Sequence, residues 1–318
     1  MSQAHPVRAS TIHGVINQAQ FGWSRDRAPI VSVGSGAELT LALPEPSGGQ
    51  IGPDSGLDAV VNLDFDRVNP SCGPILVEGA RPGDVLAVEI LRLEPSGHGW
   101  TGLFPGFGLL AHRFTEPGLR LWEIRDGFAH LGDRISVPME PMCGVVGLAP
   151  AEPGVHSPIP PRRVGGNMDI KQLGEGATVY LPVEVEGALL GMGDAHAAQG
   201  DGEVCGSAVE TPMTATVRVS VRRDLSIETP EFDVVRPLER ASAARAGYHG
   251  TTGVGPDLME AARQAVERMI AHLTAGHRLS PEDAYVLCSV AVDLKVSEVV
   301  DAPNWVVSAF LPKDLVLG

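Results

Sequence analysis

The sequence is poor in lysine and cysteine, and these shortages exclude several classes of protein. Lysine occurs only at positions 171, 295 and 313, and the formal net charge is −15. Such a charge repels a nucleic-acid backbone and an anionic membrane surface, so we expect neither as a partner. The four cysteines, at positions 72, 143, 205 and 288, form no CxxC pair. That excludes a zinc ribbon or a CxxC redox motif and argues against a disulfide framework, so we expect reduced thiols and a cytoplasmic location.

Several other signals are missing from the sequence. No stretch approaches the ~18 apolar residues of a membrane-spanning helix. The first six residues lack the charged and apolar regions of a secretory signal. No GxSxG, SxxK, HExxH, P-loop or strand-coupled GxGxxG motif occurs. Serine-nucleophile hydrolases and nucleotide-dependent enzymes therefore have little support, and we expect no nucleotide cofactor.

Glycine and proline, in contrast, are abundant, with 38 and 26 of the 318 residues. Together they stay below the ~25–30% that marks low-complexity disorder, and they suit a chain with many tight turns. Between these turns lie short apolar or alternating segments that read as strands: 30–33, 38–43, 85–91, 179–183 and 214–221. Many short strands with glycine and proline between them predict an antiparallel sandwich or barrel.

The pattern changes to a helical one near the C-terminus. Apolar residues recur at helical spacing from 256 to about 273, followed by Gly276. Ser280-Pro281-Glu282-Asp283 has the cap, proline and acids that begin a helix, which we expect to run to about 289. Two strands, 295–300 and 305–311, then follow. We therefore expect one mainly β domain over 1–318, with a β-rich body at about 25–235 and a helix-containing part at about 236–318.

The densest group of polar residues lies between Gly191 and Glu203. In an extended segment, Asp194 and His196 point the same way because side chains alternate. A carboxylate and an imidazole on one face can form half of a metal site or an acid–base pair. Gln199, Asp201 and Glu203 follow among glycines and small residues. The alternative interpretation is a polar turn between strands.

Two further segments carry candidate polar residues. Asn167 and Asp169 follow a pair of glycines and again share one parity, although Gly-Gly-Asn is also a common turn. Glu78 ends an otherwise apolar segment, where a structural ion pair with Arg81 is the better interpretation.

The motifs themselves resemble those of a known family. The segments concerned are 73–84, 141–147, 165–169, 193–206 and 279–285. In these segments the chain resembles the acetamidase/formamidase family, and the matches are collinear over roughly 25–310. The segments 13–17 and 21–26 match that family only loosely. If they line the substrate entrance, the accepted amide differs from formamide and acetamide.

This resemblance implies a cytoplasmic amidohydrolase that releases ammonia from formamide, acetamide or another short amide. It also implies a jelly-roll-like β-sandwich with α/β decoration, a homo-oligomer (a dimer or larger) and a divalent metal ion, with zinc as first choice and calcium as the alternative. Its matching motifs supply the candidate site residues Asn167, Asp169, Asp194, His196, Gln199, Asp201 and Glu203.

We interpret these candidates as parts of a metal-assisted hydrolase. Asp169, Asp194 and His196 would hold the metal, and Glu203, or else Asp201, would act as general base and then acid, with His196 also counted as catalytic. Asn167, Gln199 and Glu78 would contact or support the substrate.

Two alternatives stay open. One is an amidase with a cysteine nucleophile, Cys143 or Cys205, although nothing near either thiol in the sequence marks a lowered pKa. The other is a β-sandwich that binds a small ligand without catalysis and uses its acidic cluster for structural calcium.

Overall fold

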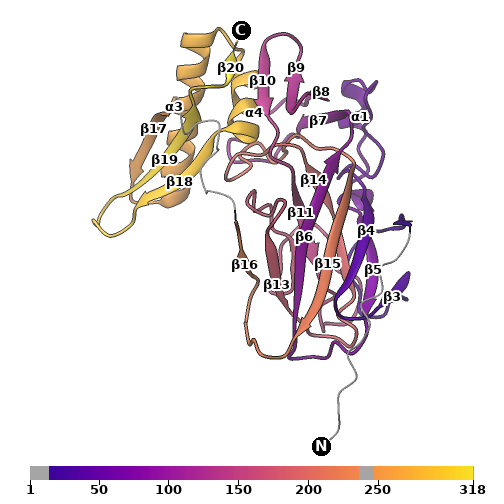
Figure 1. The fold of residues 1–318 in the computed structure, drawn as a ribbon. Coiled ribbons are helices and arrows are strands. Elements are labelled where there is room, and N and C mark those ends of the chain that lie inside the picture. The colour runs from indigo at the N-terminus through magenta and orange to yellow at the C-terminus, as the bar shows by residue number, and fades with distance from the viewer. Residues whose placement is uncertain (1–13, 236–246, 318) are drawn as a thin grey trace, which may run out of the picture.

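The computed structural model describes residues 14–235 and 247–317 and contains two facing sheets (Figure 1). The first sheet has the strand order β1 (Val15–Ile16), β4 (Ala37–Leu43), β15 (Met213–Arg222), β6 (Val85–Pro95), β13 (Thr178–Pro182) and β16 (Glu231–Asp233). The second has the order β12 (Gly165–Asn167), β11 (Met142–Gly147), β14 (Leu190–His196), β5 (Ser71–Val77) and β2 (Ala19–Gln20), with β3 (Val31–Val33) parallel to β5. Most neighbours are distant in sequence and antiparallel, as in a jelly-roll-like sandwich.

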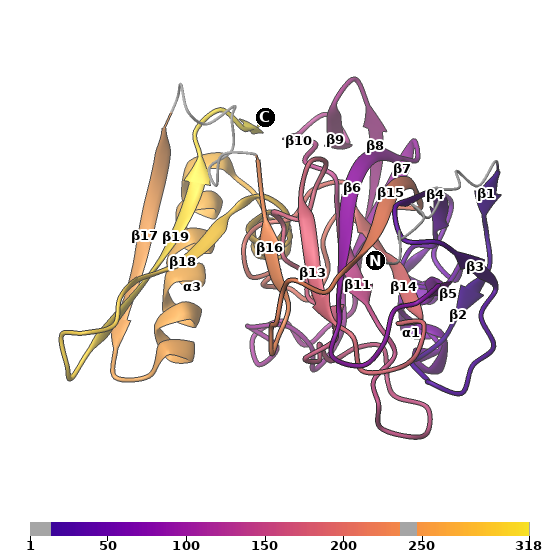
Figure 2. The ribbon, with the colours of Figure 1, turned by 60° about the horizontal axis from the view of Figure 1, so that its bottom comes forward.

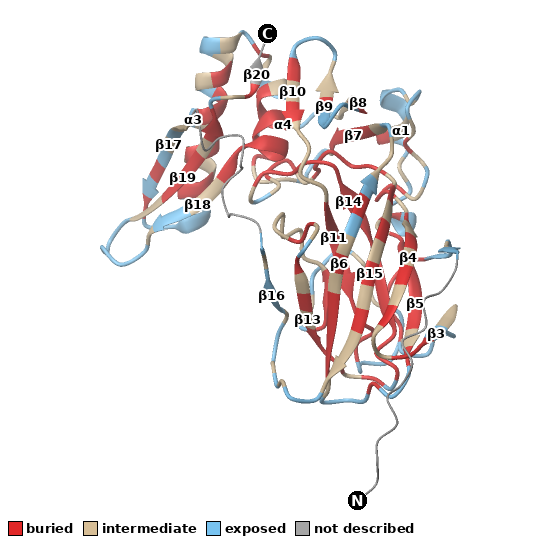
Figure 3. Cartoon of the chain, viewed as in Figure 1, coloured by how far each residue is buried: buried red, intermediate tan, exposed pale blue. Residues whose placement is uncertain are grey.

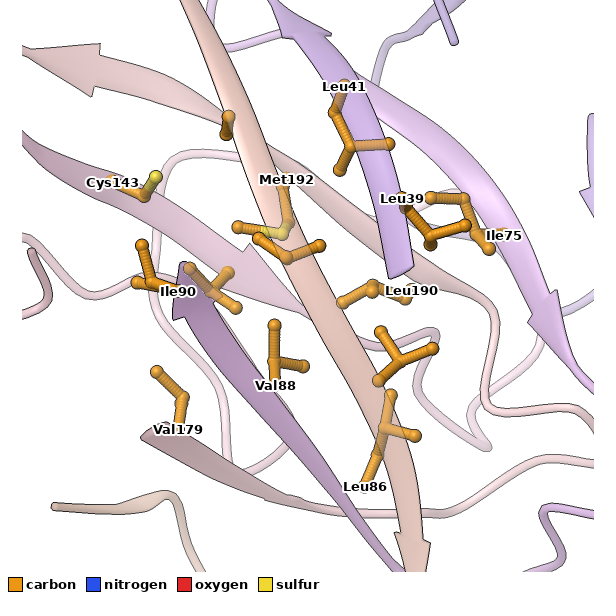
Figure 4. Close-up of a cluster of buried hydrophobic side chains, with 14 of the residues drawn as sticks. Leu39, Leu41, Ile75, Leu86, Val88, Ile90, Cys143, Val179, Leu190 and Met192 are labelled. Carbon is orange, nitrogen blue, oxygen red and sulfur yellow. The ribbon is translucent and has the colours of Figure 1, made fainter. Parts of the chain in front are cut away.

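The main hydrophobic core lies between these two sheets. Strand β4 alternates buried and half-buried residues along its length, so one face meets the core and the other is partly exposed. Figure 4 shows Leu39 and Leu41 of this strand facing side chains of the second sheet, among them Met192 and Ile75. The central strands of the second sheet, β11, β14 and β5, are buried almost throughout, as their red colour in Figure 3 shows. The expected mainly β sandwich is therefore confirmed.

A third sheet extends from one end of the sandwich. Its order is β20 (Val316–Leu317), β10 (Ile135–Pro138), β9 (Phe128–Leu131), β8 (Gly118–Arg125) and β7 (His98–Leu103). The short helix α1 (Leu57–Val61) packs against β8 through Val60, and a 3₁₀ turn follows at Phe65–Arg67. These elements were not predicted, because the segments are short and their apolar residues are interrupted by polar ones.

The C-terminal part contains the expected helices and strands. Helix α3 (Leu258–His277) lies along one face of a sheet with the order β17 (Tyr248–Gly255), β19 (Trp305–Pro312) and β18 (Asp293–Glu298), as Figure 2 shows. Helix α4 (Pro281–Ala291) begins with the predicted cap, since Ser280 Oγ accepts a hydrogen bond from the Asp283 amide at 3.1 Å.

The end of α3 differs from the prediction. Gly276 lies inside the helix, and Arg278, with a φ of 55°, takes the left-handed position that ends it. Buried Leu273 and Leu279 on either side anchor this last turn to the core, which offsets the cost of a glycine in a helix.

A second core joins the C-terminal part to the rest of the molecule. It combines Ala265, Ile270 and Leu287 of the two helices with Trp122 of β8 and Val209 of the segment after β14. The segment after β14 thus lies between the sandwich and α4. Among the described residues, no helix has the length and apolar character needed to cross a bilayer.

Candidate active site

Strand β11 brings two segments together that are far apart in the sequence. Val145 pairs with Asn167 of β12 on one side and with Gly193 of β14 on the other. The polar residues that follow Asn167 and Gly193 therefore meet at the same end of the second sheet. The structure thus places Asp169 close to Asp194 and His196.

His196 is the centre of this group. Its side chain is fully buried, and its Nε2 lies 3.2 Å from Asp194 Oδ1 and 2.9 Å from Glu210 Oε2. Its Nδ1 lies 2.7 Å from Gln199 Oε1, and the amide of Gln199 in turn donates to the backbone oxygen of Asp169 at 2.7 Å. An Nδ1–H donated to the Gln199 oxygen leaves Nε2 directed at the carboxylates.

The carboxylates form two overlapping groups around His196. Asp169, His196 and Glu203 make one and Asp194, His196 and Glu210 the other, and within each group one potential ligand atom per residue lies within 4.8 Å of the rest. Asp169 Oδ1 is buried without a hydrogen-bond partner among the described residues, whereas Glu210 Oε2 is buried against His196 Nε2. Four carboxylates facing one imidazole, with the Asp169 oxygen left without a partner, fit the needs of a divalent cation.

The pKa values of these groups reflect burial and mutual repulsion. Burial, and then the charge of Asp194, raise the pKa of Asp169 to about 7. Burial, followed by the charge of Asp169, raises the pKa of Glu203 well above its usual value. Burial alone would lower the pKa of His196, but the carboxylates of Glu210 and Asp194 raise it well above its usual value. The protein therefore holds groups here that can exchange protons near neutral pH.

The backbone at this site is unusual. Asn69, Asp169, Asp194 and Glu203 all have left-handed φ angles, between 41° and 50°, which side-chain-bearing residues rarely adopt. Gly144 of β11 makes room for them, because a Cβ there would lie 2.4 Å from Asp169 Oδ1 and 2.9 Å from Asp194 Oδ2. Such strain commonly marks functional positions.

A cavity of about 720 Å³ opens onto this group. Its polar part consists of Ser47, Asn69, Asn167, Asp169, Asp194, Glu203, Ser207 and Glu210. Asn69 Nδ2 donates to Asn167 Oδ1 at 3.0 Å and approaches Asp194 Oδ2 at 3.4 Å, which ties the asparagines to the acids. Most of the remaining wall is apolar, as is usual for a small-molecule pocket. A small molecule can thus reach the carboxylates, with His196 behind them.

Not all of the predicted site residues lie at the cavity. Gln199 is buried behind His196, and Asp201 contacts Gln172 at 3.2 Å and Lys295 at 3.7 Å. Glu78 is exposed beyond the end of β5, where it accepts a hydrogen bond from Ser32 and makes no ion pair with Arg81. None of these three lines the cavity, so we assign them no contact with substrate.

The loosely matching N-terminal segments also lie elsewhere. Residues 14–17 and 21–26 do not line the cavity, and His13 lies outside the described residues. Trp23 instead pairs through its backbone with His156, in the proline-rich loop whose residues 159–161 form part of the cavity wall.

Two residues of the site were missed by sequence reasoning. Glu210 is brought opposite His196 by an isolated antiparallel bridge, and its Oε1 accepts from the Ala208 amide at 2.8 Å. A single acid in the otherwise small and apolar run 204–212 was the available signal. Asn69 precedes a proline outside every recognised motif, and nothing in the sequence marks it.

The two candidate nucleophilic thiols are closed off from the cavity. Cys143 is completely buried in the main core, and Cys205 is almost completely buried. Burial raises the pKa of each thiol to about 12, and neither residue lines the cavity.

Comparisons with known proteins agree on one family. The sequence model of the Acetamidase/Formamidase family matches residues 14–157 and 151–316. A formamidase of Methylophilus methylotrophus is 28% identical over an alignment 364 positions long, which covers 92% of this chain and 88% of that protein.

Two solved structures are similar over nearly the whole chain. The gamma lactamase from Delftia acidovorans superposes with a TM-score of 0.86 at 26% identity, covering 94% of this chain and 89% of that one. A predicted acetamidase/formamidase from Thermoanaerobacter tengcongensis has a TM-score of 0.69 at 34% identity, covering 95% and 96% of the two chains.

Proposed function

Because this chain belongs to the acetamidase/formamidase family and is a hydrolase of linear amides, we propose that the cavity is its active site. The reaction there converts a carboxamide and water to a carboxylate and ammonia. The observation that carries the proposal is the group of four carboxylates around His196 at the cavity floor, where the buried Asp169 Oδ1 lacks a hydrogen-bond partner among the described residues. Formamide and acetamide, the amides in the names of the curated relatives, are the first substrates to assay.

In this proposal Glu203 moves the protons. Its carboxylate takes a proton from the attacking water as the new C–O bond forms, and then gives that proton to the nitrogen as the C–N bond breaks. The raised pKa of Glu203 supports both roles, because a carboxyl group with an ordinary pKa is a weak acid–base catalyst at neutral pH.

The asparagines would orient the substrate. With its Oδ1 occupied by Asn69, Asn167 has its Nδ2 group left to donate to the carbonyl oxygen of an amide. Such a donor stabilises the negative charge that develops on this oxygen as the water attacks.

Asp169, Asp194, His196 and Glu210 would hold a divalent cation. The chemistry that such a cation supplies when bound is activation of water near neutral pH and polarisation of a carbonyl group. A mixed set of one imidazole nitrogen and several carboxylate oxygens suits zinc, our first choice, whereas an all-oxygen set would favour calcium.

The test combines elemental analysis with an ammonia assay of the purified protein. We expect a divalent metal near one equivalent per chain, and loss of ammonia release after thorough chelation with recovery on readdition. His196→Ala should lower kcat at least about 100-fold. His112→Ala, which removes a surface histidine, should keep the kcat of the wild type. Full activity of chelated enzyme or of His196→Ala would contradict the metal-assisted mechanism. Absence of ammonia release from every amide tried would contradict hydrolysis itself and favour a binding module.

Cytoplasmic location and a homo-oligomer, a dimer or larger, are further parts of this proposal. Support for self-association comes from one face of the C-terminal sheet, where exposed Val254 of β17 lies opposite half-buried Val306 of β19. Sedimentation analysis of the purified protein tests the oligomer.

A further inference from the structure

The cavity is much larger than the shortest amides need. It encloses about 720 Å³, within the range of ~300–1,000 Å³ that is typical of pockets for drug-sized ligands. A water molecule takes up roughly 30 Å³ in the liquid, and formamide or acetamide is only a few times larger. An amide of that size bound at the carboxylates would leave most of the cavity filled with water.

One wall of the cavity is a continuous series of aromatic rings. Trp100 and Phe104 meet edge to face with ring centroids 6.4 Å apart, and Phe104 meets Phe65 in the same way at 6.0 Å. Trp100 is fixed at the inner end, because its indole N–H donates to the buried carboxylate of Glu45 at 2.9 Å, and that carboxylate also accepts from Ser47. The wall is therefore held in place without a ligand.

The outer end of the cavity exposes apolar side chains to water. Phe65 is 58% exposed, Phe107 52% and Ile159 38%. Two prolines after Ile159 complete this rim and restrict its backbone. Removing these apolar groups from water lowers the free energy of the complex, so an apolar ligand that covers the cavity mouth binds more tightly.

We propose that the preferred substrate is an amide whose carbonyl carries a bulky apolar group, of the size of an aromatic ring, which lies along the wall formed by Trp100, Phe104, Phe65 and Phe107. The carboxamide would lie at the polar floor and the apolar group would point toward the rim. This inference rests on the proposed function, because it assigns the substrate class of the same site.

The test compares phenylacetamide with acetamide as substrates of the metal-loaded enzyme. We expect kcat/KM for phenylacetamide to exceed that for acetamide by at least about tenfold, because a buried apolar group contributes to transition-state binding. Phe107→Ala should lower the ratio of the two kcat/KM values by about fivefold or more. Phe107 is half exposed, so this variant is expected to fold. Phe232→Ala is the matched control, since Phe232 is similarly exposed but lies on β16, outside the cavity, and it should leave the ratio unchanged.

The outcomes separate this inference from the proposed function. If acetamide is hydrolysed as efficiently as phenylacetamide, or if Phe107→Ala leaves the ratio unchanged, the substrate class is wrong while the amidase function stands. If no amide releases ammonia, the proposed function is wrong, and calorimetry decides the inference. The inference is supported if phenylacetamide binds the wild type and Phe107→Ala weakens this binding by about fivefold. It is overturned if phenylacetamide binds both proteins equally well or does not bind the wild type.

Discussion

At the scale of single residues, the site combines strain with charge. Each left-handed backbone angle at Asp169, Asp194 and Glu203 costs about 1–3 kcal/mol, and it is kept only because the surrounding structure enforces it. As a result, Asp194 of β14 and the acids of two loops, Asp169 and Glu203, meet around one imidazole, where burial and repulsion keep protons available near neutral pH. Because this arrangement destabilises the folded state, we infer that these residues serve chemistry rather than stability.

Two neighbouring acids give a sharp test of this assignment. Glu203→Gln should lower kcat by about 10²–10⁴-fold, because the variant loses the group to which we assign the acceptance and return of the proton. Asp201→Asn is the matched variant two residues away and should keep kcat within about threefold, since Asp201 faces Gln172 and Lys295 instead of the cavity. Steady-state ammonia release measures both, and equal losses in the two variants would contradict the assignment.

The thiols give a second prediction at this scale. With a pKa of about 12, roughly one in 10⁵ of the Cys143 or Cys205 side chains is a thiolate at pH 7. We therefore expect Cys143→Ala and Cys205→Ala to keep kcat within about fivefold, and iodoacetamide to inactivate the native enzyme only as slowly as it unfolds. Loss of activity in either folded variant, checked by circular dichroism, would restore the cysteine-nucleophile mechanism.

Sequence reasoning predicted part of the geometry of the candidate site for a definite physical reason. Alternation along a strand predicted that Asp194 and His196 would face the same way, and their side chains do lie 3.2 Å apart. Asp169 could be named from its motif, but its distance from His196 depends on β11 lying between β12 and β14, which no local pattern encodes. Glu210 was missed for the same reason, since its contact with His196 comes from pairing between two segments.

At the scale of elements, helix α4 holds the loop that carries Glu203. The hydroxyl of Tyr285 accepts from the Leu110 amide at 2.8 Å and donates to the backbone oxygen of Val204. One turn later, Ser289 Oγ accepts from the Cys205 amide at 3.1 Å and donates to Ser207 O at 2.7 Å. Gly200 completes this contact, because a Cβ there would lie 2.1 Å from Val292 O. The helix thus fixes the position of Glu203 without touching the cavity.

Removing one hydroxyl from this helix should therefore impair catalysis. Tyr285→Phe leaves the buried Leu110 amide without its acceptor, at a cost of about 1–3 kcal/mol, and removes one of the two hydrogen bonds to Val204 O, which keeps only the Leu109 amide. The loop can then shift. We expect kcat to fall about tenfold with little change in KM. Tyr180→Phe, which removes a hydroxyl bonded to Asp233 on the edge of the first sheet, is the control and should keep both constants. A change in Tm without a change in kcat would show that Tyr285 is structural only.

The histidines of α3 and β17 predict a dependence of stability on pH. His272 stacks on His249 with ring centroids 3.7 Å apart, and burial, followed by the charges of His249 and His277, lowers the pKa of His272. Between its folded and unfolded pKa values the unfolded chain binds more protons, so the free energy of unfolding rises with pH there. The contribution is complete above the unfolded pKa of about 6.5 and is lost as the pH falls below it.

The variant His272→Phe should keep the ring stack and remove this dependence. Denaturant unfolding at pH 7.5 and pH 5 should show a smaller loss of stability in the variant than in the wild type, by up to about 1 kcal/mol because the site is partly exposed. His112→Phe, at a surface histidine, should behave as the wild type. An equal loss in all three proteins would contradict a role for the stack.

At the scale of the whole molecule, periodicity and turn residues predicted the architecture better than the connections. Segments such as 38–43 and 85–91 were identified because apolar residues alternate or run together, and helix α4 because Ser280-Pro281 is a strong start signal. The hairpin strands β7 to β10 and the order of strands in each sheet were not predicted. Both depend on tertiary pairing, which a single sequence specifies only through the whole fold.

The cores predict how the molecule unfolds, and so whether 1–318 is one domain as expected. Leu41 is fully buried in the main core and Leu287 in the second core, which joins the C-terminal helices to β8, β10 and the segment after β14. Because that segment begins inside the sandwich and ends against α4, disorder in either core should propagate to the other. We expect one calorimetric transition, in which Leu41→Ala and Leu287→Ala each reduce stability by about 2–5 kcal/mol and shift the same peak. Leu57→Ala, at a half-exposed position of α1, should shift it little. Two peaks that respond separately to the two core variants would instead divide the chain into two domains near residue 236.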